Sequence, residues 1–324
     1  MTKRRINKQQ SARIQKIQAD FREATDENAE LNADGLIITR FSRHAEVEDS
    51  QGNRIRCSIR PHIDSLVAGD RVIWQPSEDG RGVIVSRYPR QSVLGRPDKR
   101  RSSKPVAANI TQLMIVVAAK PVLSWLLLDS YLVMAENLQL QATIVLNKVD
   151  LPCEEIKKEL ISCYQALGYP LLFTCEKDLL GFETLQTALD NHTSVFVGQS
   201  GVGKSSLISG ILPHEIEIQT AAISTFSELG CHTTSNSRLY HLPTGGALID
   251  SPGVREFGLW QMSAADIMYG FCELRILVSQ CKFRNCNHQD SPECAIIRAR
   301  NEGRVSPRRY DNFIKISTQF VARP

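Results

Sequence analysis

The sequence predicts a multidomain fold, with an N-terminal all-β barrel of the OB type, a central α/β domain around a phosphate-binding loop, and a C-terminal, mostly helical, metal-binding domain. Three observations predict it. Short apolar stretches separated by turn dipeptides fill residues 34–90, strands and helices alternate over residues 111–258, and three cysteines and a histidine cluster within residues 259–324. A chain of 324 residues is long enough for two or three such domains.

The N-terminal arm, residues 1–33, is polar and basic. The chain has a formal charge of only +4, but its basic residues concentrate in three blocks, at residues 1–19, 87–104 and 298–309. Separated basic blocks favour a polyanionic partner, most simply nucleic acid. Solvated basic surfaces that aid solubility would give the same pattern, so charge alone leaves both interpretations open.

Composition excludes several classes of protein. With 42% hydrophobic and 23% charged residues, 19 glycines and 14 prolines, the chain is not collagen-like, of low complexity or wholly disordered. Its longest apolar stretch, residues 113–119, is far shorter than the roughly 20 residues of a membrane span, and the basic N-terminus lacks a secretory signal. Nine cysteines, an odd number, argue for reduced thiols. We therefore expect a cytoplasmic monomer without membrane contact.

The predicted barrel, residues 34–90, is indicated by closely spaced strands. Its apolar stretches, separated by dipeptides such as Gly-Asn, Gly-Asp and Asp-Gly, are residues 35–38, 53–59, 70–75 and 82–86. The span of about 55 residues fits a five-stranded OB-type barrel, a fold that often binds oligonucleotides. Small barrels host many functions, so the pattern does not specify a ligand. The basic segment that follows, residues 91–110, is predicted to be a linker.

The central domain, residues 111–258, alternates apolar strands with helices. The predicted strands are residues 113–118, 142–146, 171–173, 194–197 and 247–249. The predicted helices are residues 124–138, 154–167, 182–189 and 204–212, and Gly168 ends the second of them. This alternation predicts a parallel sheet with helices on both faces.

A phosphate-binding loop follows the strand at residues 194–197, because the next eight residues match the pattern G-x-x-x-x-G-K-[ST]. Its glycines let successive backbone N–H groups surround a phosphate, Lys204 places a cation on the β- and γ-phosphates, and Ser205 offers its hydroxyl to Mg²⁺. The helix that begins here directs its positive end at the anion. A glycine turn with a surface lysine is the alternative. The residues assigned to the phosphates are Gly198, Gln199, Ser200, Gly201, Val202, Gly203, Lys204, Ser205 and Ser206.

The motif Asn147-Lys148-Val149-Asp150 predicts which base is bound. The Asp150 carboxylate can accept hydrogen bonds from N1–H and N2–H₂ of guanine, whereas adenine has neither donor and would leave a desolvated carboxylate unpaired. Lys148 can pack its stem on the base, and Asn147 can tie the loop together. A capped turn in which Asp150 serves the following helix would explain the motif without a ligand. After a buried strand and beside a phosphate-binding loop, the motif favours a guanine nucleotide.

Three further segments complete the predicted nucleotide site. Asp250-Ser-Pro-Gly253 fits a D-x-x-G element, in which Asp250 acts on Mg²⁺ directly or through water and the Gly253 N–H senses the γ-phosphate, although an ordinary Ser-Pro-Gly turn is the alternative. The segment after the strand at residues 171–173 is predicted to contact guanine through the backbone of Thr174 and Cys175. A polar stretch supplies two candidate switch threonines, of which the second is favoured as the Mg²⁺ ligand: Thr233 and Thr234.

The order of these motifs is reversed relative to most GTPases, because Asn147 and its partner loop precede the phosphate-binding loop. The same sheet would be threaded from a different starting point, a circular permutation. In this order the D-x-x-G element at Asp250 runs directly into residues 259–324. We infer that this C-terminal segment anchors the switch and receives its movement.

The cysteine cluster has the spacing Cys281-x₄-Cys286-x-His288-x₅-Cys294. Three thiolates and a neutral imidazole match a closed tetrahedral Zn²⁺ site, which has no open position for catalysis. Zinc would hold a segment with too few apolar residues to fold alone. Three unrelated thiols beside a surface histidine are the alternative.

This set of motifs resembles the bacterial circularly permuted ribosome-biogenesis GTPases, the ribosome small-subunit-dependent GTPase A family, over residues 35–310. The resemblance implies an OB domain, a permuted GTPase domain and a zinc domain. It also implies late maturation of the small ribosomal subunit through its rRNA, with GTP hydrolysis to GDP stimulated by the particle and triggering release. One departure is Cys231, where the family usually has arginine before the switch histidine.

Catalysis needs a group that orients the attacking water. Ras-like enzymes place a glutamine just after D-x-x-G, but this chain has Val254 there. His232 in the switch loop is the best candidate by position and by its ability to donate or accept a proton near neutral pH, although a surface histidine is the alternative. A binding module with a structural nucleotide, and an ATP-dependent kinase or transport ATPase, are the competing functions.

Overall fold

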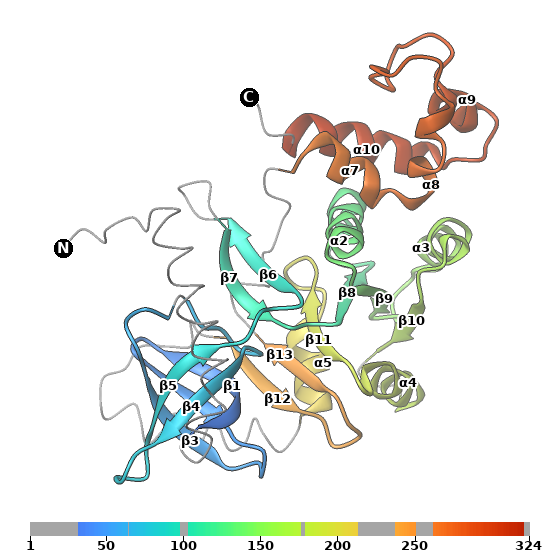
Figure 1. Cartoon of the computed structure of the whole chain (residues 1–324). Helices are drawn as coiled ribbons and strands as arrows, with labels where there is room; N and C mark the ends of the chain where they lie inside the picture. Colours follow the sequence, from blue (N-terminus) through green and yellow to red (C-terminus); the bar gives the residue numbers. More distant parts are fainter. Residues whose placement is uncertain are drawn as a thin grey trace.

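The computed structural model describes residues 32–63, 65–97, 103–175, 179–212, 237–250 and 262–320. Three parts succeed one another along the chain: a barrel of strands, a sheet flanked by helices, and a helical lobe (Figure 1). Among the helices in these ranges, none combines the length and apolar character of a bilayer span.

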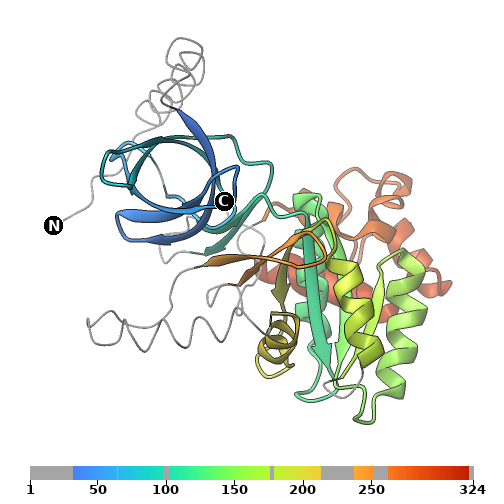
Figure 2. The same cartoon turned by 90° about the horizontal axis from the view of Figure 1, so that it is seen from below.

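The N-terminal part is a closed five-stranded barrel, which Figure 2 shows in a view along its axis. Its strands are β1 (Ala33–Phe41), β2 (His44–Glu48), β3 (Arg54–Ile59), β4 (Arg71–Pro76) and β5 (Gly82–Arg87). β1, β2 and β3 pair in turn, β3 pairs in parallel with β5, and β4 pairs with both β5 and β1 to close the barrel. Ile37, Val47, Val72 and Ile84 fill its interior with no exposed surface. The predicted OB-type barrel is confirmed.

The segment expected to be only a linker, residues 91–110, instead contains an antiparallel hairpin of β6 (Val93–Pro97) and β7 (Ser103–Ala108). Leu94 and Ala107 are fully buried in the main core. The run of basic residues obscured this pattern, because the apolar residues of the hairpin are few. The segment is therefore packed structure between the barrel and the sheet.

The central sheet has five parallel strands in the order β10-β9-β8-β11-β13. These are β8 (Gln112–Ala118), β9 (Gln141–Asn147), β10 (Leu171–Thr174), β11 (Thr193–Val197) and β13 (Ala247–Asp250). The chain runs from β8 outward to β10 and then returns to β11 on the other side of β8. This reversal lies between β8 and β11, and the carboxyl ends of strands at such a point are where α/β sheets bind ligands.

Both faces of the sheet are covered. Leu113, Ile115 and Val117 of β8 pack with α2 (Trp125–Leu138), whereas Met114 and Val116 face the opposite core. That second core includes α4 (Leu179–Leu189) and α5 (Lys204–Ile211). The predicted helix over residues 154–167 begins as α3 (Glu154–Glu159) and continues through a π turn and a 3₁₀ turn to Gly168, whose φ of 94° ends it.

The C-terminal lobe packs against α2 (Figure 1). It contains α7 (Ala264–Gly270), α8 (Cys272–Arg275), α9 (Ala295–Asn301) and α10 (Pro307–Phe320). Helices α7 and α2 approach closely at Gly270, where an added Cβ would lie 2.7 Å from the Cα of Val133. The mostly helical character predicted for this region is confirmed.

The barrel joins the central sheet through β12 (Arg238–His241), which is antiparallel to β13 and bridges to β1 at Thr39. Two polar side-chain contacts reinforce this joint. Arg238 Nη1 lies 3.0 Å from Glu46 Oε2, and His241 Nε2 lies 2.7 Å from Glu48 Oε1. The joint therefore fixes the barrel to the strand that leads into Asp250.

Candidate functional site

Three loops meet at the carboxyl edge of the parallel sheet, because each follows a strand of that sheet. Residues 198–203 join β11 to α5, residues 148–153 follow β9, and Cys175 follows β10. Their side chains and backbone contact one another directly. The sequence-predicted phosphate and base segments are therefore brought together.

The loop over residues 198–203 requires glycine at two points of close contact. Gly198 has φ 140°, and an added Cβ would lie 2.1 Å from the Val116 carbonyl oxygen. Gly203 has φ 99°, and an added Cβ would lie 2.3 Å from Asn147 Nδ2. Any other residue would push the loop away from β8 or from the β9 loop. The glycines thus permit the tight turn that precedes the N-terminus of α5.

Lys204 begins α5 and is only 6% exposed. Its Nζ donates to the carbonyl oxygens of Gly198 and Gln199, both at 2.7 Å. These bonds hold the ammonium within the loop, at the place where the sequence motif predicts the phosphates. An ammonium held at the N-terminus of a helix is suited to binding an anion.

Asn147 connects the loops. It is 2% exposed, its Nδ2 donates to Val202 O at 2.9 Å, and its Oδ1 accepts from Thr174 Oγ1 at 3.1 Å. The Val149 N–H in turn donates to the Thr174 carbonyl at 3.2 Å. A single buried amide thus ties the β9 loop to the loops after β11 and β10.

Lys148 makes a second link, and Asp150 lies beside it. Lys148 has φ 61°, and its Nζ donates to Gly201 O at 2.6 Å and to Lys120 O at 3.2 Å. The Leu151 N–H donates to the Lys148 carbonyl at 3.0 Å, which closes a turn with Asp150 exposed. The Asp150 carboxylate is thus accessible to a ligand at this edge of the sheet.

Of the remaining predicted site residues, the structure describes some and not others. Ser205 and Ser206 are exposed in the first turn of α5, and Cys175 is buried after β10. Asp250 ends β13, half-buried and opposite Arg238. Outside the described residues lie Cys231, His232, Thr233, Thr234, Gly253 and Val254.

The four predicted metal ligands lie together in the C-terminal lobe. The three Sγ atoms and a ring nitrogen of His288 all lie within 4.8 Å of one another. Cys281 Sγ lies 3.9 Å from Cys294 Sγ and 3.7 Å from His288 Nδ1, which lies 3.6 Å from Cys294 Sγ. A tetrahedral ion with Zn–S of about 2.3 Å and Zn–N of about 2.0 Å requires ligand separations of roughly 3.5–3.8 Å. This donor set therefore fits a metal ion such as zinc.

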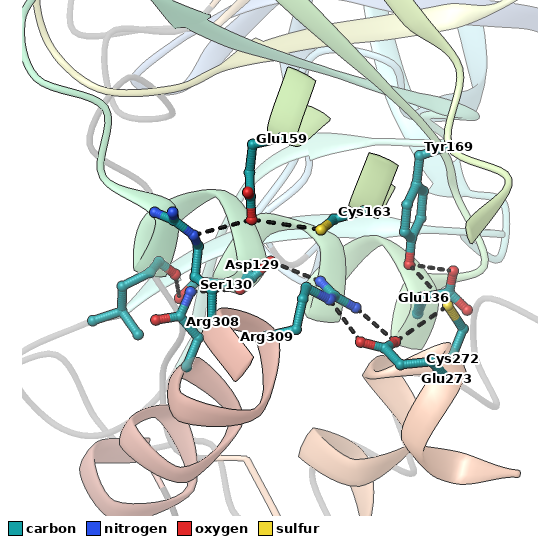
Figure 3. A network of polar contacts seen from close by, with 12 residues as sticks. Asp129, Ser130, Glu136, Glu159, Cys163, Tyr169, Cys272, Glu273, Arg308 and Arg309 are labelled. Atoms are coloured by element: carbon teal, nitrogen blue, oxygen red, sulfur yellow. Dashed lines mark hydrogen bonds and ion pairs between the residues drawn. The ribbon is translucent and has the colours of Figure 1, made fainter. Parts of the chain in front are cut away.

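One buried network was not anticipated from the sequence (Figure 3). Arg309 of α10 is 1% exposed; its Nη1 donates to Asp129 Oδ1 of α2 at 2.7 Å, and its Nε and Nη2 donate to the two Glu273 carboxylate oxygens at 2.7 and 2.8 Å. Asn312 Nδ2 also donates to Asp129, at 2.6 Å. The guanidinium lies 4.7 Å from the Phe271 ring centroid. The signal in the sequence was a lone acid within an apolar helix, WLLLDSYLVMA.

The ionisable groups of this network shift one another's pKa values. Burial alone would lower the pKa of Arg309, but the carboxylates of Asp129 and Glu273 raise it well above its usual value. Burial alone would raise the pKa of Glu273. The hydrogen bonds and the charge of Arg309 together outweigh that effect, so the pKa of Glu273 is lowered overall. Burial raises the pKa of Asp129, although the charge of Arg309 and the hydrogen bonds from Arg309 and Asn312 oppose that rise. The lobe is therefore joined to α2 by a buried guanidinium that is hydrogen-bonded to two carboxyl groups.

The comparisons with known proteins agree with this arrangement. The sequence profile of the RsgA GTPase family matches residues 87–260. A protein of Alcanivorax borkumensis named small ribosomal subunit biogenesis GTPase RsgA is 47% identical over 338 residues, which cover 98% of this chain and 96% of that one. A protein of the same name from Haemophilus influenzae is 43% identical over 98% of this chain and 95% of its own length.

Two solved structures are also similar. YjeQ from Thermotoga maritima is 31% identical with a TM-score of 0.74, over 91% of this chain and 100% of that one. YloQ, described as a circularly permuted GTPase, is 27% identical with a TM-score of 0.70, over 89% of this chain and 95% of that one. The predicted circular permutation is thereby confirmed.

Proposed function

This chain belongs to the RsgA GTPase family, and on that premise we propose that it assists late maturation of the small ribosomal subunit, with hydrolysis stimulated by the particle and triggering release. The observation that carries the proposal is the direct linkage of the phosphate loop to the base loop through Asn147 and Lys148. Two loops joined in this way can hold opposite ends of one nucleotide.

The roles of the site residues follow from their chemistry. Asp150 selects guanine, with Asn147, Lys148 and the backbone of Thr174 and Cys175 shaping the base pocket. Lys204 and the N–H groups of the loop neutralise the phosphates, while Asp250 and Gly253 respond to the γ-phosphate. The loop residues assigned to the phosphates are Gly198, Gln199, Ser200, Gly201, Val202, Gly203, Ser205 and Ser206. Mg²⁺, held by Ser205 and Thr234, would stabilise charge on the phosphates.

His232 is the residue proposed to orient the attacking water, because Val254 cannot do so. A partner that positions His232 against the nucleotide would account for stimulation by the particle. Thr233 is the less favoured alternative to Thr234 as a Mg²⁺ ligand.

Each of the domains has its own role in this proposal. The arm (1–33), barrel (34–90) and segment 91–110 carry two of the basic blocks, and the barrel fold is suited to rRNA. The GTPase domain (111–258) passes its nucleotide state to the zinc domain (259–324). We place the protein in the cytoplasm as a monomer that binds GTP and GDP.

Turnover of GTP with and without purified small ribosomal subunits tests this function. We expect slow hydrolysis alone and at least about a tenfold increase with small subunits, because the particle would position His232 for the reaction. Large subunits serve as the control particle. His232→Ala is expected to keep guanine-nucleotide binding and to lose the stimulation.

The absence of any stimulation, with guanine nucleotide still bound, would instead indicate a binding module with a structural nucleotide. Stimulation that survives in His232→Ala would remove the histidine from its proposed role while leaving the function intact.

Zinc in the cysteine cluster is proposed to hold the C-terminal lobe together. Cys294 is the N-cap residue of α9, and the Tyr310 hydroxyl of α10 donates to the His288 carbonyl at 2.7 Å, so residues of the cluster contact both helices. We expect the zinc content to be about one ion per chain in the wild type and nearly none in Cys294→Ser. The helical signal of the variant should also be lost at a lower temperature than that of the wild type. Cys163→Ser, outside the cluster, is the matched control.

Loss of zinc is also expected to disturb guanine-nucleotide-dependent release from the small subunit, because the switch leads directly into this lobe. Unchanged release from a protein that metal analysis shows to be zinc-free would contradict that coupling.

A further inference from the structure

A small cavity of about 10 Å³ lies beneath the phosphate loop, between that loop and α2. Its lining includes Ser124, Leu127, Tyr131, Gly198, Gln199 and Val202. A volume of this size accommodates about one water molecule, provided that the water finds two or more polar partners.

Two buried polar atoms at this cavity find no hydrogen-bond partner among the described residues: the Tyr131 hydroxyl and Gln199 Oε1. Tyr131 is 2% exposed, and the Gln199 oxygen is enclosed although the residue as a whole is half-buried. Unpaired buried polar atoms are costly, and two around one cavity are usually joined by water. Ser124, whose Oγ accepts from the Leu127 N–H, offers a third polar group.

The surroundings of the tyrosine are consistent with this arrangement. Burial raises the pKa of Tyr131 to about 12, and a weak backbone hydrogen bond from Gly198 opposes that rise. The hydroxyl therefore stays protonated, and because the Gly198 N–H can only donate to its oxygen, the O–H proton still needs an acceptor. On another side of α2, Asp129 is held by Arg309. The helix that carries Tyr131 is thus fixed to the C-terminal lobe while the tyrosine reaches the phosphate loop.

We propose that Tyr131 is a positioning residue for the phosphate loop, and that its hydroxyl holds Gln199 through one water molecule in the cavity. The hydroxyl donates to the water, and the water donates to Gln199 Oε1. This bridge fixes the first turn of the loop, where Gly198 and Gln199 also supply the carbonyls that orient Lys204. The inference depends on the proposed function, because it assumes that this loop binds a guanine nucleotide.

Release of a fluorescent GDP analogue from the full-length protein tests the inference. Tyr131→Phe removes only the hydroxyl, and we expect release about three- to tenfold faster, as the loss of one hydrogen bond predicts. Gln199→Met, of similar volume, should give a comparable change. The double variant should be no faster than either single variant, because both changes break the same bridge.

Tyr169→Phe is the matched control, since its buried hydroxyl donates to Glu136 on the same helix, away from the loop. It is expected to change thermal stability but not GDP release. A Tyr131→Phe rate within twofold of wild type, or additive effects in the double variant, would overturn the inference. Failure of the wild-type protein to bind the GDP analogue would instead overturn the proposed function.

Discussion

Replacing Arg309 by leucine is expected to lower the free energy of unfolding of the C-terminal lobe by about 3–5 kcal/mol, the cost of breaking a buried ion pair from one side. The side chains of Asp129 and Glu273 are 0% and 9% exposed, so neither carboxylate can recover hydration where it lies. The lobe must then separate from α2 or keep uncompensated charge in its core. Urea unfolding, followed by the helical signal, measures the change.

Two further variants identify the cause. Arg304→Leu breaks an exposed pair with Glu302 and should cost less than about 1 kcal/mol. Replacing Arg309, Asp129 and Glu273 together by Met, Leu and Met should recover most of the lost stability, because buried ion pairs are often no more stabilising than apolar groups of the same volume. An Arg309→Leu variant no less stable than Arg304→Leu would show that the network does not hold the lobe.

The parts of the fold that the sequence predicted are those with one dominant physical signal. β8 and β9 are buried on both faces, so each consists mainly of apolar residues in sequence. β2 was missed because it has only two apolar residues, Ala45 and Val47, and these alternate with polar residues in the sequence HAEVE. One of the polar residues, Glu46, forms ion pairs with Arg54 and Arg238. The β6–β7 hairpin was missed because a basic run surrounds its few apolar residues.

The candidate site divides in the same way. The phosphate-binding motif predicts the roles of its glycines and of Lys204. The order of the strands predicts that the loops after β9 and β11 lie at one edge of the sheet. The link from Asn147 to Val202, the joint of β12 with β1, and the cavity beside Tyr131 depend on tertiary packing between segments far apart in sequence. No local pattern records such contacts, apart from an isolated acid such as Asp129 in an apolar helix.

Replacing Asp150 by asparagine is expected to change which purine the site selects. An aspartate accepts from both N1–H and N2–H₂ of guanine, whereas an asparagine presents one acceptor and one donor, so the donor meets the guanine amino group. Loss of hydrogen bonds to a charged group predicts at least about a hundredfold weaker GDP binding. Xanthine has a carbonyl in place of the amino group, so the variant should bind xanthosine diphosphate better than GDP.

Because Asp150 is exposed and lies outside the buried contacts that join the loops, its replacement should leave the structure of the loops unchanged. Competition of GDP, xanthosine diphosphate and ADP against a fluorescent GDP analogue measures the selectivity, and Asp311→Asn, on the exposed surface of α10, is the control. Since the phosphate contacts of Lys204 are common to all three nucleotides, any reversal of their order must arise at the base. Unaltered preference for GDP in Asp150→Asn, or displacement by ADP as effective as by GDP in the wild type, would show that the carboxylate does not read the purine.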